Sequence, residues 1–245
     1  MNILDSMKDI VKHTGGLGFL DMVKIVGEPG AARVESIDTD KTVVLFGEMY
    51  QPIADLDTTI GLSRLQILRG YMDLHSGSTV SVIKEQRGQT DVPVELKFDN
   101  GAGIVANYRF MSEAMINEQI KVPAFKGATW NVSIAPEKKS IANFASYQGI
   151  LGGFEKRFTV GTSGSKLNFT IGSGPTDRVT IPFDVNVTGE LKTAWSYPIA
   201  QTLSILKLAD TSSTVNMHFS DMGALKIDID SGIGKYSYIL PAGKS

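Results

Sequence analysis

The 245-residue sequence contains no cysteine, which excludes disulfide bonds, thiol nucleophiles and thiolate metal sites. It has only three histidines, and none is spaced for a His-x-x-x-His metal motif. No apolar run approaches the length of a membrane-spanning helix, and charged residues interrupt any signal-peptide pattern. The formal net charge is only −2, so the chain is not a basic protein that coats nucleic acid. We therefore expect no metal, no other cofactor and no membrane partner.

The stretch from Ser213 to Pro241 carries the clearest secondary-structure pattern. Apolar and polar residues alternate, the alternation stops at Asp230-Ser231-Gly232, and it then resumes. Successive side chains of a strand face opposite sides of a sheet, and a tight turn favours residues that tolerate positive φ angles. The pattern therefore predicts antiparallel strands joined by this turn.

Two short segments of this region also occur earlier, in the same order and at nearly the same separation. Ser78-Thr79-Val80 precedes Ser213-Thr214-Val215, and the turn Asp99-Asn100-Gly101 precedes Asp230-Ser231-Gly232. We interpret the two matches as the trace of a duplicated unit, although segments this short also recur by chance. A chain of 245 residues is long enough for two domains.

Each half of the chain shows the same order of elements: a helix, strands, a second helix and further strands. Helical periodicity predicts helices at Ile3–His13, Asp57–His75, Pro136–Gly149 and Ser196–Leu208. Thr58 or Thr59 is the expected N-cap of the second helix. Alternation predicts strands that include Thr79–Lys84, Val92–Phe98, Gly103–Met111, Lys156–Val160, Lys166–Ile171 and Arg178–Val185. The fold class is therefore α+β, with two duplicated domains that each hold antiparallel sheets and two helices.

The first domain is expected at residues 1–112 and the second at residues 130–245. Residues 113–129 interrupt the strand rhythm and contain Pro123, which cannot donate a hydrogen bond within a central strand. We predict an extended interdomain connector there.

No group of residues indicates catalysis, so we do not expect an enzyme. The glycine-rich segments 161–164 and 172–175 lack the Gly-Lys-Ser/Thr ending of a phosphate-binding loop, and neither leads into a helix. His218 alternates with Met217 and Phe219, which is more typical of a structural histidine than of a catalytic one. Asp38 and Asp40 fit a turn better than a cation site.

Three segments resemble DNA polymerase sliding clamps of the proliferating cell nuclear antigen type, including those of T4-type bacteriophages. Glu35–Val44 is similar to an early hairpin of that family, Gly234–Ala242 to its terminal strand, and Ala54–Leu68 to the entry of the second helix in the phage proteins. The order of elements follows the family along essentially the whole chain.

The resemblance implies a homotrimer whose six domains close into a ring around duplex DNA without sequence preference. A clamp loader would place this ring on DNA, and the ring would tether the replicative DNA polymerase as a processivity factor. Such a clamp is no enzyme and needs no cofactor. The resemblance implies a cytoplasmic protein, in the host cytoplasm if the source is a bacteriophage.

The resemblance places duplex DNA against the polar faces of the four helices. Those faces carry seven basic and four acidic residues in a chain of net charge −2, so positive charge is concentrated on them. Any single lysine there also fits an ordinary solvated surface. The expected DNA-binding residues are Lys8, Lys12, Arg64, Arg69, Lys138, Lys139 and Lys207.

The resemblance also implies two protein-binding surfaces. Partner peptides are expected in an apolar pocket of Ile37, Val44, Val122, Phe125, Tyr238, Leu240 and Pro241, although Ile37 and Val44 equally fit core positions. Subunits are expected to join through edge strands 104–111 and 178–184, although an internal strand fits each pattern too. The expected interface residues are Ile104, Ala106, Tyr108, Phe110, Val179, Ile181 and Phe183.

A β-rich structural protein of a virion or tail, built from duplicated sandwiches, is the alternative. It would show the same composition and the same glycine-rich turns. A clamp has to present basic helices to DNA phosphates, whereas a virion protein does not, so the charge of the helix faces distinguishes the two hypotheses.

Overall fold

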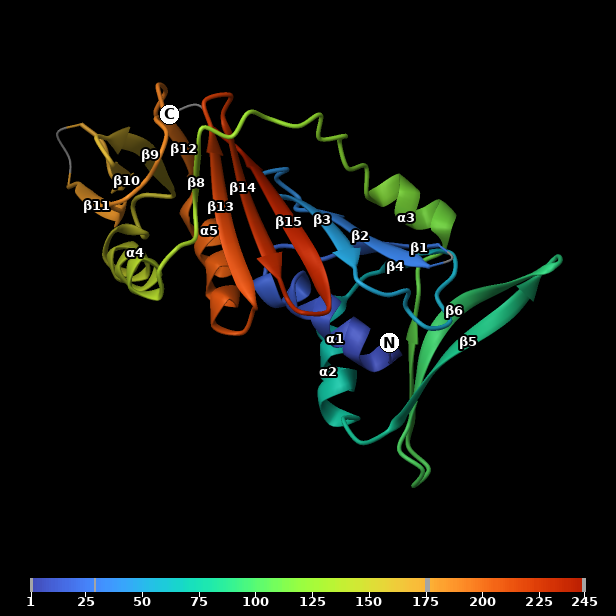
Figure 1. Ribbon diagram of the computed structural model, residues 1–245. Helices are drawn as coiled ribbons and strands as arrows, with labels where there is room; N and C mark the ends of the chain where they lie inside the picture. The colour runs from blue at the N-terminus through green and yellow to red at the C-terminus, as the bar shows by residue number, and fades with distance from the viewer. Residues whose placement is uncertain (1, 29, 175–176, 244–245) are drawn as a thin grey trace. The chain divides into compact units, whose positions relative to one another are not determined.

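The computed structural model describes residues 2–28, 30–174 and 177–243. The chain divides into two compact units (Figure 1). Unit 1 comprises Met1–Pro123 and Ile233–Tyr236, and unit 2 comprises Ala124–Gly232 and Ser237–Ser245. The boundary at Pro123 lies within the segment that we expected to be a connector, and the last strand contributes its first residues to unit 1.

Unit 1 contains the helices and antiparallel strands expected from the sequence, together with β4 and α3, which were not expected. Its first elements are α1 (Ile3–Lys12), a 3-10 turn (Gly15–Leu17), β1 (Val23–Glu28), β2 (Ala31–Ile37), β3 (Val44–Met49) and β4 (Thr59–Leu62). Its later elements are α2 (Leu65–Leu74), β5 (Thr79–Arg87), β6 (Thr90–Asp99), β7 (Val105–Arg109) and α3 (Glu113–Gln119). The strands form the sheets β4-β1-β2-β3 and β5-β6-β7.

The helix predicted at Ile3–His13 is confirmed as α1. The Asn2 side chain accepts a hydrogen bond from the Leu4 amide at 3.0 Å and caps its first turn. Met7 and Ile10 are fully buried, so this helix packs into the core of unit 1 through its apolar face. The basic residues are left on its outer face.

The prediction of a helix from Asp57 was wrong for its first part. Residues Thr59–Leu62 form β4 and pair with β1, and α2 begins only at Leu65. Neither Thr58 nor Thr59 caps the helix, because its N-cap is Arg64. Threonine, isoleucine and glycine are poor helix formers, and Gly61 is required here because a Cβ would lie 2.7 Å from Ile116 of α3.

Unit 2 repeats this order. It contains β8 (Val132–Ile134), α4 (Lys138–Leu151), β9 (Arg157–Ser163), β10 (Lys166–Ile171), β11 (Val179–Asp184) and β12 (Trp195–Pro198). It continues with α5 (Ile199–Leu206), a 3-10 turn (Lys207–Asp210), β13 (Thr214–Ser220), β14 (Ala224–Asp230) and most of β15 (Gly234–Pro241). The sheets are β11-β10-β9-β12 and β15-β14-β13-β8. A phenylalanine cluster fills its core, where the rings of Phe169 and Phe183 stack at 3.9 Å.

The duplicated segments occupy equivalent places. The Ser-Thr-Val segments begin β5 and β13, each of which is the first strand after the second helix of its unit. The two Asp-x-Gly turns also match: the Asp99 carboxylate accepts from the Gly101 amide at 3.0 Å, and that of Asp230 from the Gly232 amide at 2.8 Å. The α+β fold with antiparallel sheets is therefore confirmed.

The connector is only partly extended. Residues Glu113–Gln119 form α3, whose N-cap Ser112 accepts from the Met115 amide at 3.4 Å. Residues 121–130 form neither helix nor strand. The predicted connector therefore begins with a short helix. The helix was not predicted because Pro123 was taken as evidence that the whole segment is extended.

Candidate functional surfaces

The basic residues of unit 1 lie on α1 and at the start of α2. Lys8 and Lys12 are one helical turn apart and line a cavity of about 330 Å³ together with Asp5, Asp9 and Ile233. Within the described part of the chain, neither lysine forms an ion pair. Their charge is therefore available to an anionic ligand.

Arg64 and Arg69 differ in their local geometry. Arg64 is exposed and adopts a left-handed backbone conformation, with φ of 52°. Arg69 lies 3.9 Å from Asp73 one turn later on α2, and both side chains are exposed. This surface ion pair lowers the net charge that α2 offers to DNA.

In unit 2 the structure brings Lys138 and Lys207 together. They come from the start of α4 and the end of α5 and line one cavity of about 330 Å³, floored by apolar side chains such as Ile141 and Leu206. Lys138 lies 3.6 Å from Asp210. Lys139 is exposed beside it. The two helices of unit 2 thus bring Lys138 and Lys207 to one surface, where Asp210 offsets part of their charge.

A buried polar network beneath α1 was missed by sequence reasoning. The Tyr236 hydroxyl donates to the Asp9 carboxylate at 2.7 Å, and the Tyr236 ring stacks on His13 at 4.1 Å. The His13 Nδ1 atom lies 2.9 Å from the Asp9 carbonyl oxygen. Burial lowers the pKa of His13, although the Asp9 carboxylate opposes this effect. The network ties α1 to the start of β15, so it positions Lys8 and Lys12 rather than performing chemistry.

The residues expected in the peptide pocket are divided between the units. In unit 1, Val44 is buried, while Ile37 and Val122 are half-buried. Ile37 lines a cavity of about 310 Å³ together with the connector residues Gln119 and Lys121. An early hairpin and the connector therefore do meet at one hollow of unit 1.

In unit 2, Phe125 and Pro241 are exposed, whereas Tyr238 and Leu240 are fully buried. The expectation that Tyr238 and Leu240 line an exposed groove therefore needs correction. Alternation along β15 turns both side chains into the core, because large apolar residues gain more from burial than from exposure.

The two strands expected at the subunit interface are both edge strands. β7 ends the sheet β5-β6-β7, and β11 ends the sheet β11-β10-β9-β12. The opposite edge strand β5 carries a bulge between Ile83 and Lys84, a feature that discourages pairing, and the ladder of β11 with β10 has a similar irregularity at Leu167 and Asn168. The register between β6 and β7 has no such irregularity, so β7 is the more regular of the two edges.

Four of the seven side chains assigned to this interface point into the cores. Tyr108 and Phe110 are buried in unit 1, and Ile181 and Phe183 are buried in unit 2, so they serve the cores of their own units. The Tyr108 hydroxyl donates to the Ser63 carbonyl oxygen, and burial raises the pKa of Tyr108 to about 12. Ile104 precedes β7 and is exposed, while Ala106 and Val179 are half-buried.

Backbone hydrogen bonds identify the groups that face outward from β7. The Phe110 amide donates to the Val94 carbonyl at 2.8 Å, and the Asn100 amide donates to the Ile104 carbonyl at 3.2 Å. In an antiparallel ladder the direction of these bonds alternates along the strand. The amide and carbonyl groups of Val105, Asn107 and Arg109 therefore point away from β6, toward the open edge.

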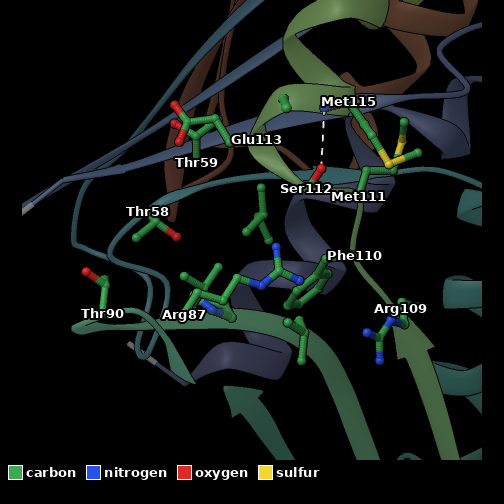
Figure 2. A pocket seen from close by; sticks show the side chains of 15 residues that line it. Thr58, Thr59, Arg87, Thr90, Arg109, Phe110, Met111, Ser112, Glu113 and Met115 are labelled. Carbon is green, nitrogen blue, oxygen red and sulfur yellow. Dashed lines mark hydrogen bonds between the residues drawn. The ribbon is translucent and has the colours of Figure 1, made fainter. Parts of the chain in front are cut away.

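A cavity of about 670 Å³ lies in unit 1 at the end of β7 (Figure 2). Figure 2 shows the Arg87 side chain extending toward Phe110, with Glu113 and Thr59 across the cavity. Arg109 lies 3.0 Å from Glu85 and 3.5 Å from Glu95, and it lowers the pKa of Glu85. These internal pairs compensate its charge, and the lining residues include no histidine and no nucleophile paired with a base.

In the described ranges no cluster of three histidine, aspartate or glutamate residues is arranged to hold a metal ion. Within the same residues, no helix is long and apolar enough to cross a membrane.

Neither a scan of protein-family models nor a search of curated proteins finds a match to this chain. Solved structures do match it. PCNA from Thermococcus kodakaraensis is 13% identical, with a TM-score of 0.69 over 99% of this chain and 98% of that one. A. fulgidus PCNA, in a structure with the C-terminal region of FEN-1 bound, is 11% identical, with a TM-score of 0.69 over 98% and 96% of the two chains. The chain therefore has the PCNA-like fold of DNA sliding clamps.

Proposed function

We propose that the protein is a sliding clamp that encircles duplex DNA and tethers the replicative DNA polymerase. The observation that carries this proposal is the match to the PCNA fold over nearly the full length of both chains. The open edges of β7 and β11, one in each unit, support it because head-to-tail pairing of two different edges is how one chain builds a ring.

In this proposal, β7 of one copy pairs with β11 of the next, and three copies close a ring of six units. Apolar helix surfaces beside each edge add to the interface. α4 packs on β11 and exposes Tyr147 and Ile150, with Phe154 just beyond it 88% exposed. α2 lies beside β7 and exposes Ile67 and Leu74, the latter 83% exposed. Exposed apolar patches of this kind mark protein–protein contacts.

The basic residues of α1, α2, α4 and α5 are the proposed DNA contacts. Lysine and arginine on helix surfaces contact phosphates without reading bases, which suits a protein that slides. The ring acts by topology, so no catalytic residue is needed. Proteins that use it would include the polymerase and a clamp loader.

Partners are proposed to bind through short peptides at the hollow of Ile37, Gln119 and Lys121 in unit 1. The structural neighbour from A. fulgidus carries the C-terminal region of FEN-1, which is a precedent for a protein segment bound to this fold. Met22 and Ile37 are the apolar residues among the polar ones that line this hollow, so it suits an extended peptide with an apolar anchor flanked by polar groups.

Retention on circular DNA tests the proposal. We expect the protein, loaded by its clamp loader, to stay on a nicked circular duplex at moderate salt and to slide off after linearisation, because a closed ring leaves only over an end. Light scattering should show a trimer. A monomer that binds circular and linear DNA equally would contradict the proposal and favour the virion protein.

A further inference from the structure

The turn that joins β6 to β7 contains two neighbouring groups that can react with each other. Of all the asparagines in the sequence, only Asn100 is followed by a glycine. Because glycine has no side chain, nothing on Gly101 hinders the approach of its backbone nitrogen to the Asn100 carboxamide. Residues 100–105 are exposed, so water has access to the turn.

The Asp99 carboxylate lies at the backbone nitrogen of Gly101. Its Oδ1 atom accepts a hydrogen bond from the Gly101 amide at 3.0 Å, and its Oδ2 atom lies 3.1 Å from Lys97 Nζ. The Gly101 hydrogen bond and then Lys97 lower the pKa of Asp99, so the carboxylate is ionised at neutral pH. A carboxylate in this position can take the proton of the amide that it accepts from.

The oxygen of the Asn100 carboxamide is held by two backbone amides. Its Oδ1 atom accepts from the Ala102 amide at 2.9 Å and from the Ile104 amide at 3.1 Å. The chain curls around this oxygen because Gly101 and Gly103 have φ angles of 70° and 95°. Two N–H donors stabilise the negative charge that develops on a carbonyl oxygen when a nucleophile adds to its carbon.

We propose that Asn100 is a site of self-catalysed deamidation. The Gly101 nitrogen is the nucleophile, the Asp99 carboxylate is the base, and the amides of Ala102 and Ile104 stabilise the oxyanion. The only co-reactant is water from the solvent. The turn thus brings together the three kinds of group that acyl transfer requires.

The first step forms a bond between the Gly101 nitrogen and Asn100 Cγ, and the proton of that nitrogen passes to Asp99. The Cγ–Nδ2 bond then breaks, and Nδ2 takes this proton and leaves as ammonia. A cyclic imide remains. Water next adds to either carbonyl of the imide and breaks its bond to the Gly101 nitrogen, which gives aspartate or isoaspartate. Nothing is oxidised or reduced.

The duplicated turn of unit 2 lacks only the reactive side chain. The Asp230 carboxylate accepts from the Gly232 amide at 2.8 Å, as Asp99 does from Gly101. Ser231 stands where unit 1 has Asn100, and serine has no carboxamide. An Asp-x-Gly turn therefore forms without asparagine, so Asn100→Ser is a control that keeps the turn.

The modification would act on the strand that follows. The Asn100 amide donates to the Ile104 carbonyl at 3.2 Å, just before β7 begins at Val105. Isoaspartate adds a methylene group to the backbone and so displaces the start of β7. If β7 joins the subunits, aged chains form fewer trimers. Only this consequence rests on the proposed function.

Peptide mapping by mass spectrometry tests the proposal on the intact protein, incubated at neutral pH and 37 °C in ¹⁸O-labelled water. We expect Asn100 to become aspartate and isoaspartate with one heavy oxygen, and isoaspartyl methyltransferase to label the product. The same protein unfolded in urea is the reference. The folded turn should react at least about threefold faster, because its donors and base are already in place.

Two variants separate the base from the turn. Asp99→Asn keeps an oxygen for the Gly101 amide but removes the base, so it should deamidate at position 100 roughly two- to tenfold more slowly. In light scattering, aged wild-type protein should lose trimers that aged Asn100→Ser protein keeps. Deamidation no faster in the folded chain than in urea, or unaffected by Asp99→Asn, would overturn the proposal. Both rates are measured without DNA or assembly, so such a result leaves the proposed clamp function standing.

Discussion

Arg64 is a proposed DNA contact that sits in a strained backbone conformation. Its φ of 52° is a conformation that glycine adopts without strain and that other residues adopt at a cost of about 1 kcal/mol. We expect Arg64→Gly to keep or raise the free energy of unfolding, by up to about 1 kcal/mol after the entropy of the unfolded glycine is counted. The same variant should bind DNA more weakly, with a salt slope lower by about one.

Urea unfolding and DNA titrations at several salt concentrations measure the two effects of Arg64→Gly. Arg64→Lys is the control, because it keeps both the charge and the strain. If Arg64→Gly instead lowers the free energy of unfolding, the Arg64 side chain stabilises the fold.

His13 makes stability depend on pH. Its pKa is lowered in the folded protein, so the unfolded chain takes up the proton first and folding loses free energy as pH falls below about 6.5. We expect the free energy of unfolding to fall by at most about 1.4 kcal/mol per pH unit in that range. In the His13→Gln variant the free energy of unfolding should fall less steeply with pH, because this titrating group is gone. Urea titrations between pH 8 and pH 5 measure the difference. Parallel curves for the two proteins would assign the acid sensitivity to other groups.

The strand β7 is an element whose two sides can be tested separately. The Asn107 amide points to the open edge, whereas the Ala106 amide points toward β6. We expect Asn107→Pro to leave unit 1 folded and to give monomers in light scattering, because it removes a donor only from the open edge. Ala106→Pro should instead destabilise the unit by at least about 1 kcal/mol, since it leaves a ladder partner unsatisfied. A trimeric Asn107→Pro protein would refute the β7 interface.

At the level of elements, the sequence predicts the order of helices and strands better than their faces. The alternation in β7 and β11 divides the side chains of each strand into two faces. It does not show which face is turned to the core and which to the solvent. The large side chains of Tyr108 and Phe183 go to the core, where burial stabilises most. The Asp9–Tyr236 bond joins residues 227 positions apart, so no local pattern announces it. β4 was missed because its four residues, Thr59–Leu62, come just before a helix. A stretch this short fits the period of a helix as well as that of a strand.

For the whole molecule, the decisive quantity is where the charge lies rather than its total. Changing Lys8, Lys12 and Arg64 to glutamate should shorten retention on circular DNA and lower its salt dependence, while the trimer stays intact. A matched control changes the exposed Lys166, Lys192 and Lys235 to glutamate, which alters the net charge equally. Polymerase processivity and DNA retention at moderate salt measure both proteins. Equal losses in the two would mean that overall charge, and not the helix faces, attracts DNA.

The first residues of β15 belong to unit 1, where Tyr236 binds Asp9 and stacks on His13. Tyr236 is synthesised after all of the other unit 1 residues and after nearly all of unit 2. The N-terminal half of the nascent chain therefore waits for the C-terminal end before its core is complete. A chain truncated just before Tyr236 should therefore be sensitive to proteolysis in both units, and not only in unit 2.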